Sequence, residues 1–202
     1  MLLENATDFS WDELSKLLAD GMHRLSTTCT VLQKCHGAIE KMTYQFCAHC
    51  GSRLAAFDHR GTPRQRCEQC DRIHFRNPTV GVAVILLRDH RLLLTQRRCG
   101  RWCIPCGHVE WHEDVETAAR RELHEETGLK CELIRVLNVQ SNFHDPASHT
   151  VGVWYLGRET GGALSAGDDA LRAEFVDLND IPELAFPTDK AVIEQLATAM
   201  RR

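Results

Sequence analysis

The chain has 202 residues, which is enough for one ordinary domain and a small additional module. Its apolar fraction of 43% and its charged fraction of 26% are typical of a globular protein in water. A net charge of −4 gives no overall electrostatic reason to expect nucleic acid or an anionic membrane as the main partner. The longest apolar run, residues 80–87, is too short to cross a bilayer, so we expect no membrane contact.

Residues 1–41 carry no chemical motif, and we expect them to form a helical N-terminal extension. Ser10 and Glu13 make a capping box, and Gly21 ends the helical pattern. The apolar stripe of this helix faces a core or a partner and is the candidate surface of a homodimer: Trp11, Leu14, Leu17 and Leu18. The first residues lack a basic segment followed by an apolar one, so we expect no signal peptide and a cytoplasmic protein.

The ten cysteines are the next informative feature. Four of them form two Cys-x-x-Cys pairs separated by sixteen residues, which is the spacing of a zinc site with four thiolate ligands: Cys47, Cys50, Cys67 and Cys70. Gly51 and Asp71 follow the second cysteine of each pair, where a residue that tolerates positive φ is useful. We expect a zinc ribbon over residues 42–76, in which Zn²⁺ is structural because four protein ligands leave no coordination position open.

The ribbon leaves two alternatives open. His49 and His74 lie close to the cysteines in sequence and are alternative zinc ligands. The region is also locally basic, which favours contact with nucleic acid or with a protein. Its arginines are Arg53, Arg60, Arg64, Arg66, Arg72 and Arg76.

The chain from residue 77 to residue 202 is expected to form one α/β (α+β) domain. Pro78 pushes the preceding residue out of helical conformation and marks the boundary. Apolar and β-branched residues predict strands at 79–87, 91–97, 132–140, 150–156 and 173–178. A last helix is predicted over 189–200 after a Thr188 cap, with Val192, Ile193, Leu196 and Met200 facing inward. Together with the helix described next, this order predicts a mixed-sheet α/β/α sandwich.

The best-defined element is a helix predicted over residues 115–127. Asp114 is its expected N-cap and Gly128 its expected stop. Glu122, Glu125 and Glu126 stand at i, i+3 and i+4, which puts three carboxylates on one face. The expected packing face consists of Val115, Ala118, Ala119 and Leu123.

Three neighbouring carboxylates repel one another, and a hard divalent cation with oxygen ligands converts this repulsion into coordination. Mg²⁺ or Mn²⁺ bound by carboxylates and by substrate phosphates is the expected case. The simpler alternative is a solvated acidic helix. The residues around the helix favour the metal site.

The segment 107–129 resembles a complete Nudix box. The matching positions are Gly107, Glu113, Arg121, Glu122, Leu123, Glu125, Glu126, Gly128 and Leu129. The resemblance to Nudix hydrolases covers residues 79 to about 200. A zinc ribbon directly before such a domain resembles the subgroup of NADH, FAD and ADP-ribose pyrophosphatases.

The resemblance implies roles for the residues of the box. Glu122 and Glu126 would be the principal metal ligands, and Glu125 would be shared between metal and water. The backbone carbonyl of Gly107 would add another oxygen. The implied reaction is attack of water on a diphosphate phosphorus, without a covalent nucleophile.

Other roles implied by the resemblance concern residues around the helix. Arg121 would pair with Glu113 and fix the loop against the helix. A box glutamate or a downstream acid would accept the proton of the attacking water, and Glu174 or Asp169 would supply that acid. Cys106 and His112 stand where the family often has glycine, and we expect thiols near the box to be unligated.

The implied substrate is a nucleoside diphosphate linked to another moiety. Of the motif that NADH-cleaving members carry after the box, only Gln140 is present, which disfavours NADH as the preferred substrate. Asp145-Pro146 followed by His149-Thr150-Val151 resembles ADP-ribose-type members, so we expect ADP-ribose first and FAD or an NAD-type dinucleotide next. The candidate contacts to base and phosphate are Arg97, Arg101, Phe143 and Trp154. Alternative functions are a Nudix sensor module, sanitation of nucleoside triphosphates and RNA decapping.

Overall fold

The computed structural model describes residues 44–145 and 148–200. They fall into two compact units, one containing residues 79–144 and 149–200, and a smaller one containing residues 44–78 with 145 and 148. The predicted N-terminal helix and its apolar stripe lie outside the described residues. Among the helices within these ranges, none is long and apolar enough to span a membrane.

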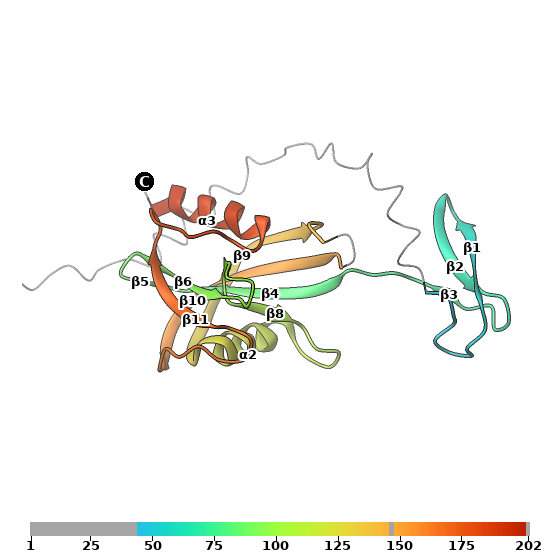
Figure 1. The fold of residues 1–202 in the computed structure, drawn as a ribbon, viewed down its shortest axis with the longest axis horizontal. Coiled ribbons are helices and arrows are strands. Elements are labelled where there is room, and N and C mark those ends of the chain that lie inside the picture. The colour runs from blue at the N-terminus through green and yellow to red at the C-terminus, as the bar shows by residue number, and fades with distance from the viewer. Residues whose placement is uncertain (1–43, 146–147, 201–202) are drawn as a thin grey trace, which may run out of the picture. The chain divides into compact units, whose positions relative to one another are not determined.

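Two sheets form the centre of the larger unit (Figure 1). The first has the order β8-β4-β10-β9 and is mixed, because β4 and β10 run parallel whereas β8 and β9 are antiparallel to their neighbours. Its strands are β4 (Thr79–Ile85), β8 (Cys106–His108), β9 (Leu129–Asn142) and β10 (Thr150–Gly162). The second sheet has β6 between β11 and β5, with β7 also paired to β6. Its strands are β5 (Leu87–Arg88), β6 (Arg91–Gln96), β7 (Trp102–Cys103) and β11 (Arg172–Asp177).

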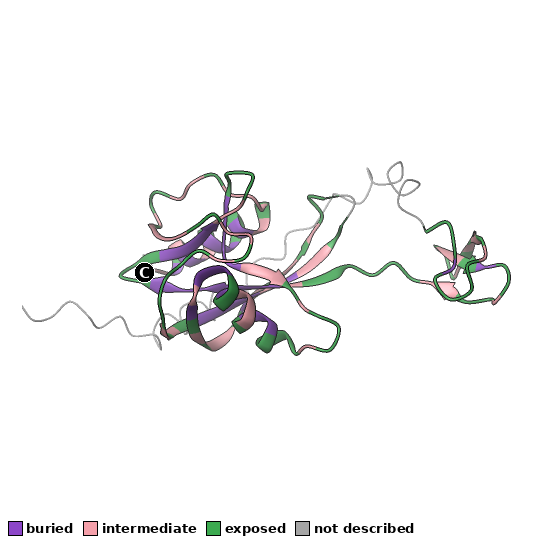
Figure 2. Ribbon diagram, turned by 60° about the horizontal axis from the view of Figure 1, so that its bottom comes forward, coloured by how far each residue is buried: buried purple, intermediate pink, exposed green. Residues whose placement is uncertain are grey.

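Two helices cover opposite faces of these sheets, α2 (Val115–Thr127) and α3 (Pro187–Met200). Strand β4 shows why both faces are covered. Its Val82 and Val84 pack in the core cluster under α2, whereas Ala83 and Ile85 pack in the cluster under α3. Successive strand side chains point to opposite faces, so an unbroken apolar run requires burial on both sides. The structure confirms the predicted mixed α/β sandwich, with its buried residues along the strands and the inner helix faces (Figure 2).

Several predicted boundaries were wrong. Helix α3 begins at Pro187 and not after Thr188, since a proline suits the first helical position, where its missing N–H costs nothing. Strands β9 and β10 extend beyond their apolar runs, because backbone pairing continues through the polar residues of the hairpin. No strand was predicted between residues 97 and 107, yet this segment contains strand β7, whose Trp102 is buried.

The smaller unit is a three-stranded antiparallel sheet of β1 (Leu54–His59), β2 (Thr62–Cys67) and β3 (Ile73–His74). Strands β1 and β2 are joined by Arg60 and Gly61, which both have positive φ, as a two-residue hairpin turn requires. Gly51 and Asp71 also have positive φ, at 74° and 63°. They close the two cysteine turns as expected, with their amides donating to the carbonyls of Cys47 and Cys67.

Candidate active site and zinc site

Helix α2 is held at both ends by local contacts. The Asp114 carboxylate accepts hydrogen bonds from the amides of Glu116, at 3.0 Å, and Thr117, at 3.4 Å. At the other end Gly128 adopts the left-handed conformation with φ 68°, and its amide donates to the carbonyl of His124. Both predicted caps are confirmed. They fix the length of the helix and therefore which residues occupy its last two turns.

The packing face of α2 is smaller than predicted. Ala118, Ala119 and Leu123 are buried against the sheet. Val115 is 37% exposed, so its predicted packing role was wrong. It is the first residue of the helix.

Arg121 is the hub of the acidic face. Its guanidinium donates two hydrogen bonds of 2.8 Å to the carboxylate of Glu113, which is the predicted pair. It also donates to Glu122 and Glu125, each at 2.9 Å, and to the carbonyl of His108 at 3.1 Å. One cation thus links the loop after β8 to two of the three clustered glutamates.

These contacts shift the proton affinities of the partners. The hydrogen bonds from Arg121 lower the pKa of Glu113, and the bonds to Glu113 raise the pKa of Arg121. Each partner therefore favours the charged form of the other. A fixed ion pair of this kind holds the geometry of its neighbours.

Gly107 and Glu122 meet where β8 passes the helix. The Glu122 carboxylate occupies the place that a Cβ atom of residue 107 would need. Burial raises the pKa of Glu122 despite its contact with Arg121. Glycine at position 107 is therefore required for a carboxylate to lie directly against the backbone of β8.

Glu126 is the most buried carboxylate of the three, with 2% of its surface exposed. One of its oxygens, Oε2, accepts from the amide of Cys106 at 3.0 Å and from the hydroxyl of Thr95 at 3.4 Å. Burial raises the pKa of Glu126 to about 8, and the neighbouring Cys103 adds to this shift. A nearby cation would relieve the cost of ionising this group.

The segment between β10 and β11 passes over the end of α2. The amides of Ser165 and Gly167 donate to the carbonyls of Thr127 and Glu126. Asp168 and Asp169 follow in this segment, and each is close enough to a box glutamate, Glu122 and Glu126 respectively, to raise its pKa. The acidic site therefore receives carboxylates from outside the helix as well.

Arg97 lies beside this segment, and Arg101 does not. The Arg97 guanidinium pairs with Asp169 at 3.3 Å and lies over the Phe186 ring, 5.4 Å from its centroid. Arg101 pairs with the exposed Glu183 at 2.9 Å. Among the proposed phosphate contacts, Arg97 is therefore the one next to the carboxylates.

The other predicted substrate contacts lie in three different environments. Phe143 is 60% exposed at the end of β9, and its ring packs edge-on against His149. Trp154 is only 5% exposed in the core under α3, and its indole N–H donates to Asp189. A ring buried in this way has no free face for a base, so Trp154 is not retained as a contact.

Glu174 lies on the wrong face for the acidic site. In the register of β11 and β6, Glu174 lies opposite Leu94, whereas Ala173 lies opposite Thr95. Directly paired residues point to the same face, so Glu174 faces the α3 side and Thr95 faces Glu126. The Glu174 carboxylate pairs instead with Arg172. Of the two acids predicted before the last strand, Asp169 is the one beside the box.

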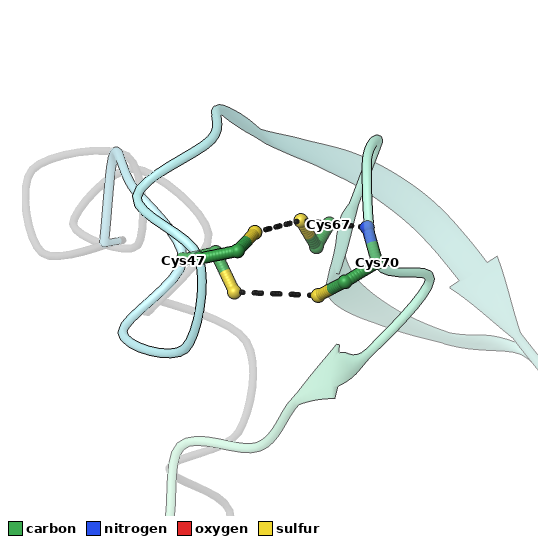
Figure 3. A group of neighbouring side chains, drawn as sticks. Cys47, Cys67 and Cys70 are labelled. Carbon is green, nitrogen blue, oxygen red and sulfur yellow. Dashed lines mark hydrogen bonds between the residues drawn. The ribbon is translucent and has the colours of Figure 1, made fainter.

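In the smaller unit the four cysteines of the two turns converge (Figure 3). Their sulfur atoms all lie within 4.8 Å of one another. Cys47 and Cys70 are 3.7 Å apart, and Cys50 and Cys67 are 3.4 Å apart. This donor set and spacing fit a tetrahedral zinc ion with four thiolates.

His74 lies at the edge of this cluster, and its Nε2 atom is 3.2 Å from the sulfur of Cys47. Four cysteines already complete a tetrahedral shell. The imidazole is therefore positioned to donate to a thiolate, as partners of zinc ligands commonly do.

The donor chemistry of the acidic site suits the divalent cation that its pattern predicts. Glu122, Glu125 and Glu126 offer only oxygen donors, which suits Mg²⁺ or Mn²⁺ better than a soft metal. Two of these carboxylates are held by Arg121 and the third by the amide of Cys106. Their orientation therefore comes from contacts within the protein.

Comparison with known proteins agrees with this geometry. A family model described as the NUDIX domain matches residues 77–196, more than half of the chain. The chain belongs to the Nudix family. It is a Nudix pyrophosphohydrolase. A relative of this class, an ADP-ribose pyrophosphatase of Methanocaldococcus jannaschii, is 40% identical over 123 residues. The match covers 58% of this chain and 73% of the relative.

Two further Nudix proteins are similar. An NAD-capped RNA hydrolase NudC of Vibrio atlanticus is 28% identical over 145 residues, which cover 70% of this chain and 52% of that protein. The crystal structure of a Nudix hydrolase from Nitrosomonas europaea superposes with a TM-score of 0.67 at 26% identity, covering 75% of this chain and 89% of that one.

Two side chains beside the acidic site were not predicted from the sequence. Thr95 donates a hydrogen bond to Glu126, and Asp168 lies close enough to Glu122 to raise its pKa. Neither carries a signal in the sequence, because the position of Thr95 depends on how β6 pairs and that of Asp168 on how the segment before β11 passes the helix.

Proposed function

We propose that this Nudix domain hydrolyses the diphosphate bond of a nucleoside diphosphate linked to a second group. ADP-ribose is the leading substrate, and FAD or an NAD-type dinucleotide is the next. The observation that carries the proposal is the acidic face of α2, where Arg121 orients Glu122 and Glu125 and where Gly107 makes room for Glu122. The 40% identity to an ADP-ribose pyrophosphatase supports the choice of substrate.

The three clustered glutamates, with the carbonyl of Gly107, would hold Mg²⁺ or Mn²⁺. When bound, the cation supplies neutralisation of phosphate oxygens and a lower pKa for coordinated water. Arg121 keeps two of the ligands in place, and the amide of Cys106 keeps Glu126 turned inward. Ligands fixed in this way need no reorganisation when the substrate binds.

The remaining chemistry belongs to charged groups beside the helix. Arg97 supplies a positive charge for a phosphate of the substrate, and Asp169, its ion-pair partner, accepts the proton of the attacking water. The products from ADP-ribose are AMP and ribose 5-phosphate, since water adds to one phosphorus and the bridging oxygen leaves with the other.

A substrate panel tests this proposal. The full chain is incubated with ADP-ribose, FAD, NADH and oxidised nucleoside triphosphates, each with Mg²⁺ or Mn²⁺, and the products are identified by mass. We expect cleavage of a diphosphate linked to a second group, fastest for ADP-ribose. Release of pyrophosphate from a nucleoside triphosphate as the fastest reaction would instead assign sanitation of nucleotides.

Glu126→Gln separates a catalytic metal site from a solvated acidic helix. We expect this change to lower kcat by at least about 100-fold. The thermal unfolding temperature of the metal-free protein should stay unchanged or rise slightly, because the substitution removes a buried charge. Glu116→Gln is the matched control on the same helix, where the carboxylate is exposed and pairs with Arg120. Equal activity of the two variants would contradict metal binding by Glu126 and would favour the alternative that the domain is a sensor module.

A second candidate function is hydrolysis of the same kind of diphosphate bond in the cap at the 5′ end of an RNA. The smaller unit favours it, because three arginines lie over aromatic rings there: Arg53 over Phe46, Arg64 over Phe75 and Arg66 over Phe57, at 5.4 to 5.9 Å. Arginines in contact with aromatic rings suit single-stranded nucleic acid, because both can stack on bases. The similarity to NAD-capped RNA hydrolases points in the same direction.

Charge reversal in the ribbon tests this candidate. Arg64→Glu should weaken hydrolysis of a dinucleotide-capped RNA while leaving free ADP-ribose hydrolysis unchanged, with a steep salt dependence for the RNA alone. Equal effects on both substrates would exclude the ribbon as an RNA contact.

A further inference from the structure

A third Cys-x-x-Cys sequence lies outside the ribbon, at Cys103-Ile104-Pro105-Cys106. It connects β7, which ends at Cys103, to β8, which begins at Cys106. Neither residue belongs to the four-cysteine cluster found among the described residues. The proposed reaction uses neither thiol, so this pair has no assigned role.

The two thiols neighbour one another three residues apart, and a side-chain hydrogen bond between them lowers the pKa of Cys103 and raises the pKa of Cys106. Cys103 has no exposed surface and its sulfur lies 3.5 Å from the hydroxyl of Thr95, while Cys106 is partly exposed as a residue. Arg97 lies near both side chains. The pair therefore places two thiols side by side at a connection between two sheets.

The same residues touch the acidic site. The amide of Cys106 donates to Glu126, and Thr95 contacts both Cys103 and Glu126. Gly107 follows Cys106 directly, and its backbone has no spare room beside the carboxylate of Glu122. A movement of Cys106 is therefore transmitted to two of the three clustered glutamates.

We propose that Cys103 and Cys106 form a reversible disulfide that disables the acidic site. A peroxide oxidises one of the two thiols to the sulfenic acid with release of water, and the sulfur of the other cysteine then attacks it and expels a second water. In balance, two thiols lose two electrons and two protons, and hydrogen peroxide becomes two waters. A dithiol reductant reverses the bond by exchange.

The structural consequence follows from the difference in distance between contact and bond. Thiols in hydrogen-bond contact must approach to about 2.05 Å. Cys103 is anchored, because it is fully buried and pairs with Thr95 across β6 and β7. Cys106 is the partner that moves, which draws its amide away from Glu126 and displaces Gly107 from Glu122. The loss of activity rests on the proposed function, whereas the disulfide does not.

The first experiment maps the bond in the full chain with its zinc. After treatment with hydrogen peroxide and alkylation of free thiols, mass spectrometry should find the peptide with residues 103–106 lighter by two hydrogens and unalkylated. Cys131→Ser should retain this product, and Cys103→Ser should lose it. Zinc released to a chromogenic chelator reports damage to the ribbon separately. Alkylated Cys103 and Cys106 at peroxide doses that release zinc would overturn the proposal.

The second experiment measures function as the ratio of oxidised to reduced activity within each protein, so that a change in basal activity does not matter. We expect oxidation to lower the activity by about tenfold or more, and dithiothreitol to restore it. Oxidation should not lower the activity of Cys103→Ser. Cys106→Ala should behave in the same way and serves as the second variant if Cys103→Ser folds poorly. Full activity of a mapped disulfide form would overturn the switch. Absence of hydrolysis by the reduced protein would instead refute the proposed function. In that case the affinity for Mn²⁺ is compared between the oxidised and the reduced protein. Equal affinity of the two forms would overturn the proposed switch.

Discussion

A Cβ atom on Gly107 would overlap the carboxylate of Glu122. This contact joins β8, an edge strand of the mixed sheet, to the acidic face of α2. It explains why a glycine is needed at the start of the motif: a carboxylate lies where every other residue has its first side-chain atom. The relationship gives the most direct test of the site.

Gly107→Ala should push the Glu122 carboxylate aside, because the added Cβ atom would overlap it. We expect kcat/KM for ADP-ribose to fall by about 100-fold, because a displacement of about 1 Å has this effect in a catalytic site. The affinity for Mn²⁺, measured by calorimetry, should fall in parallel. Unchanged metal affinity and activity would show that Glu122 is not a ligand in this position.

Arg121→Lys should weaken the site although the charge is kept. A lysine cannot form the bidentate pair with Glu113 and also reach Glu122 and Glu125. We expect metal affinity to fall by about 10- to 100-fold, as for other residues that orient metal ligands. Arg120→Lys is the control, since its guanidinium pairs with the exposed Glu116. Equal metal affinity in both variants would contradict the hub role.

Asp169→Asn should lower kcat by about 100-fold, because the proton acceptor is lost. Glu174→Gln should leave kcat unchanged, since Glu174 points to the opposite face of the sheet. The measurement is kcat of both variants at saturating metal. A loss of kcat in Glu174→Gln with none in Asp169→Asn would reverse the assignment.

Asp189 should make stability fall as pH rises. Its carboxylate is 2% exposed and accepts from the amide of Ile104 and the indole of Trp154, each at 3.0 Å. Burial raises its pKa from 3.8 to about 6. The folded state holds the proton more tightly, so this stabilisation is complete below pH 3.8 and is lost as pH rises through about 6.

A pKa shift of about two units corresponds to a loss of about 3 kcal/mol in the free energy of unfolding between pH 4 and pH 7. Asp189→Asn cannot ionise, so its unfolding free energy should lack this component, although the variant is less stable at pH 4 through a mismatched hydrogen bond. Urea unfolding of both proteins at the two pH values measures the difference. Parallel pH dependence in the two proteins would rule out Asp189 as its source.

Cys67→Ser should abolish binding of a zinc ion by the smaller unit. The sulfur of Cys67 is buried in the cluster, and a structural zinc ion contributes on the order of 10 kcal/mol to folding such a segment. Metal analysis should find zinc in the native chain and in Cys131→Ser, the control outside the cluster, but not in Cys67→Ser. Proteolysis at the ribbon arginines should increase in that variant. Stoichiometric zinc in Cys67→Ser would point to His74 as a replacement ligand.

Much of the fold and site could be predicted because the relevant signals are local. The caps Asp114 and Gly128 depend on residues within one turn of α2, and the spacing of three glutamates fixes their common face. The cysteine spacing similarly brings four sulfur atoms together through two tight turns. The Arg121–Glu113 pair followed from the family resemblance.

The sequence by itself therefore determined the sandwich, the acidic face and the four-cysteine cluster. The tertiary structure decided which distant residues join the acidic face. Glu174 and Trp154 were assigned to the site from sequence, yet strand register turns Glu174 to the far face and core packing covers Trp154. Register and sheet order are global properties, since moving a strand by one residue reverses every side chain on it.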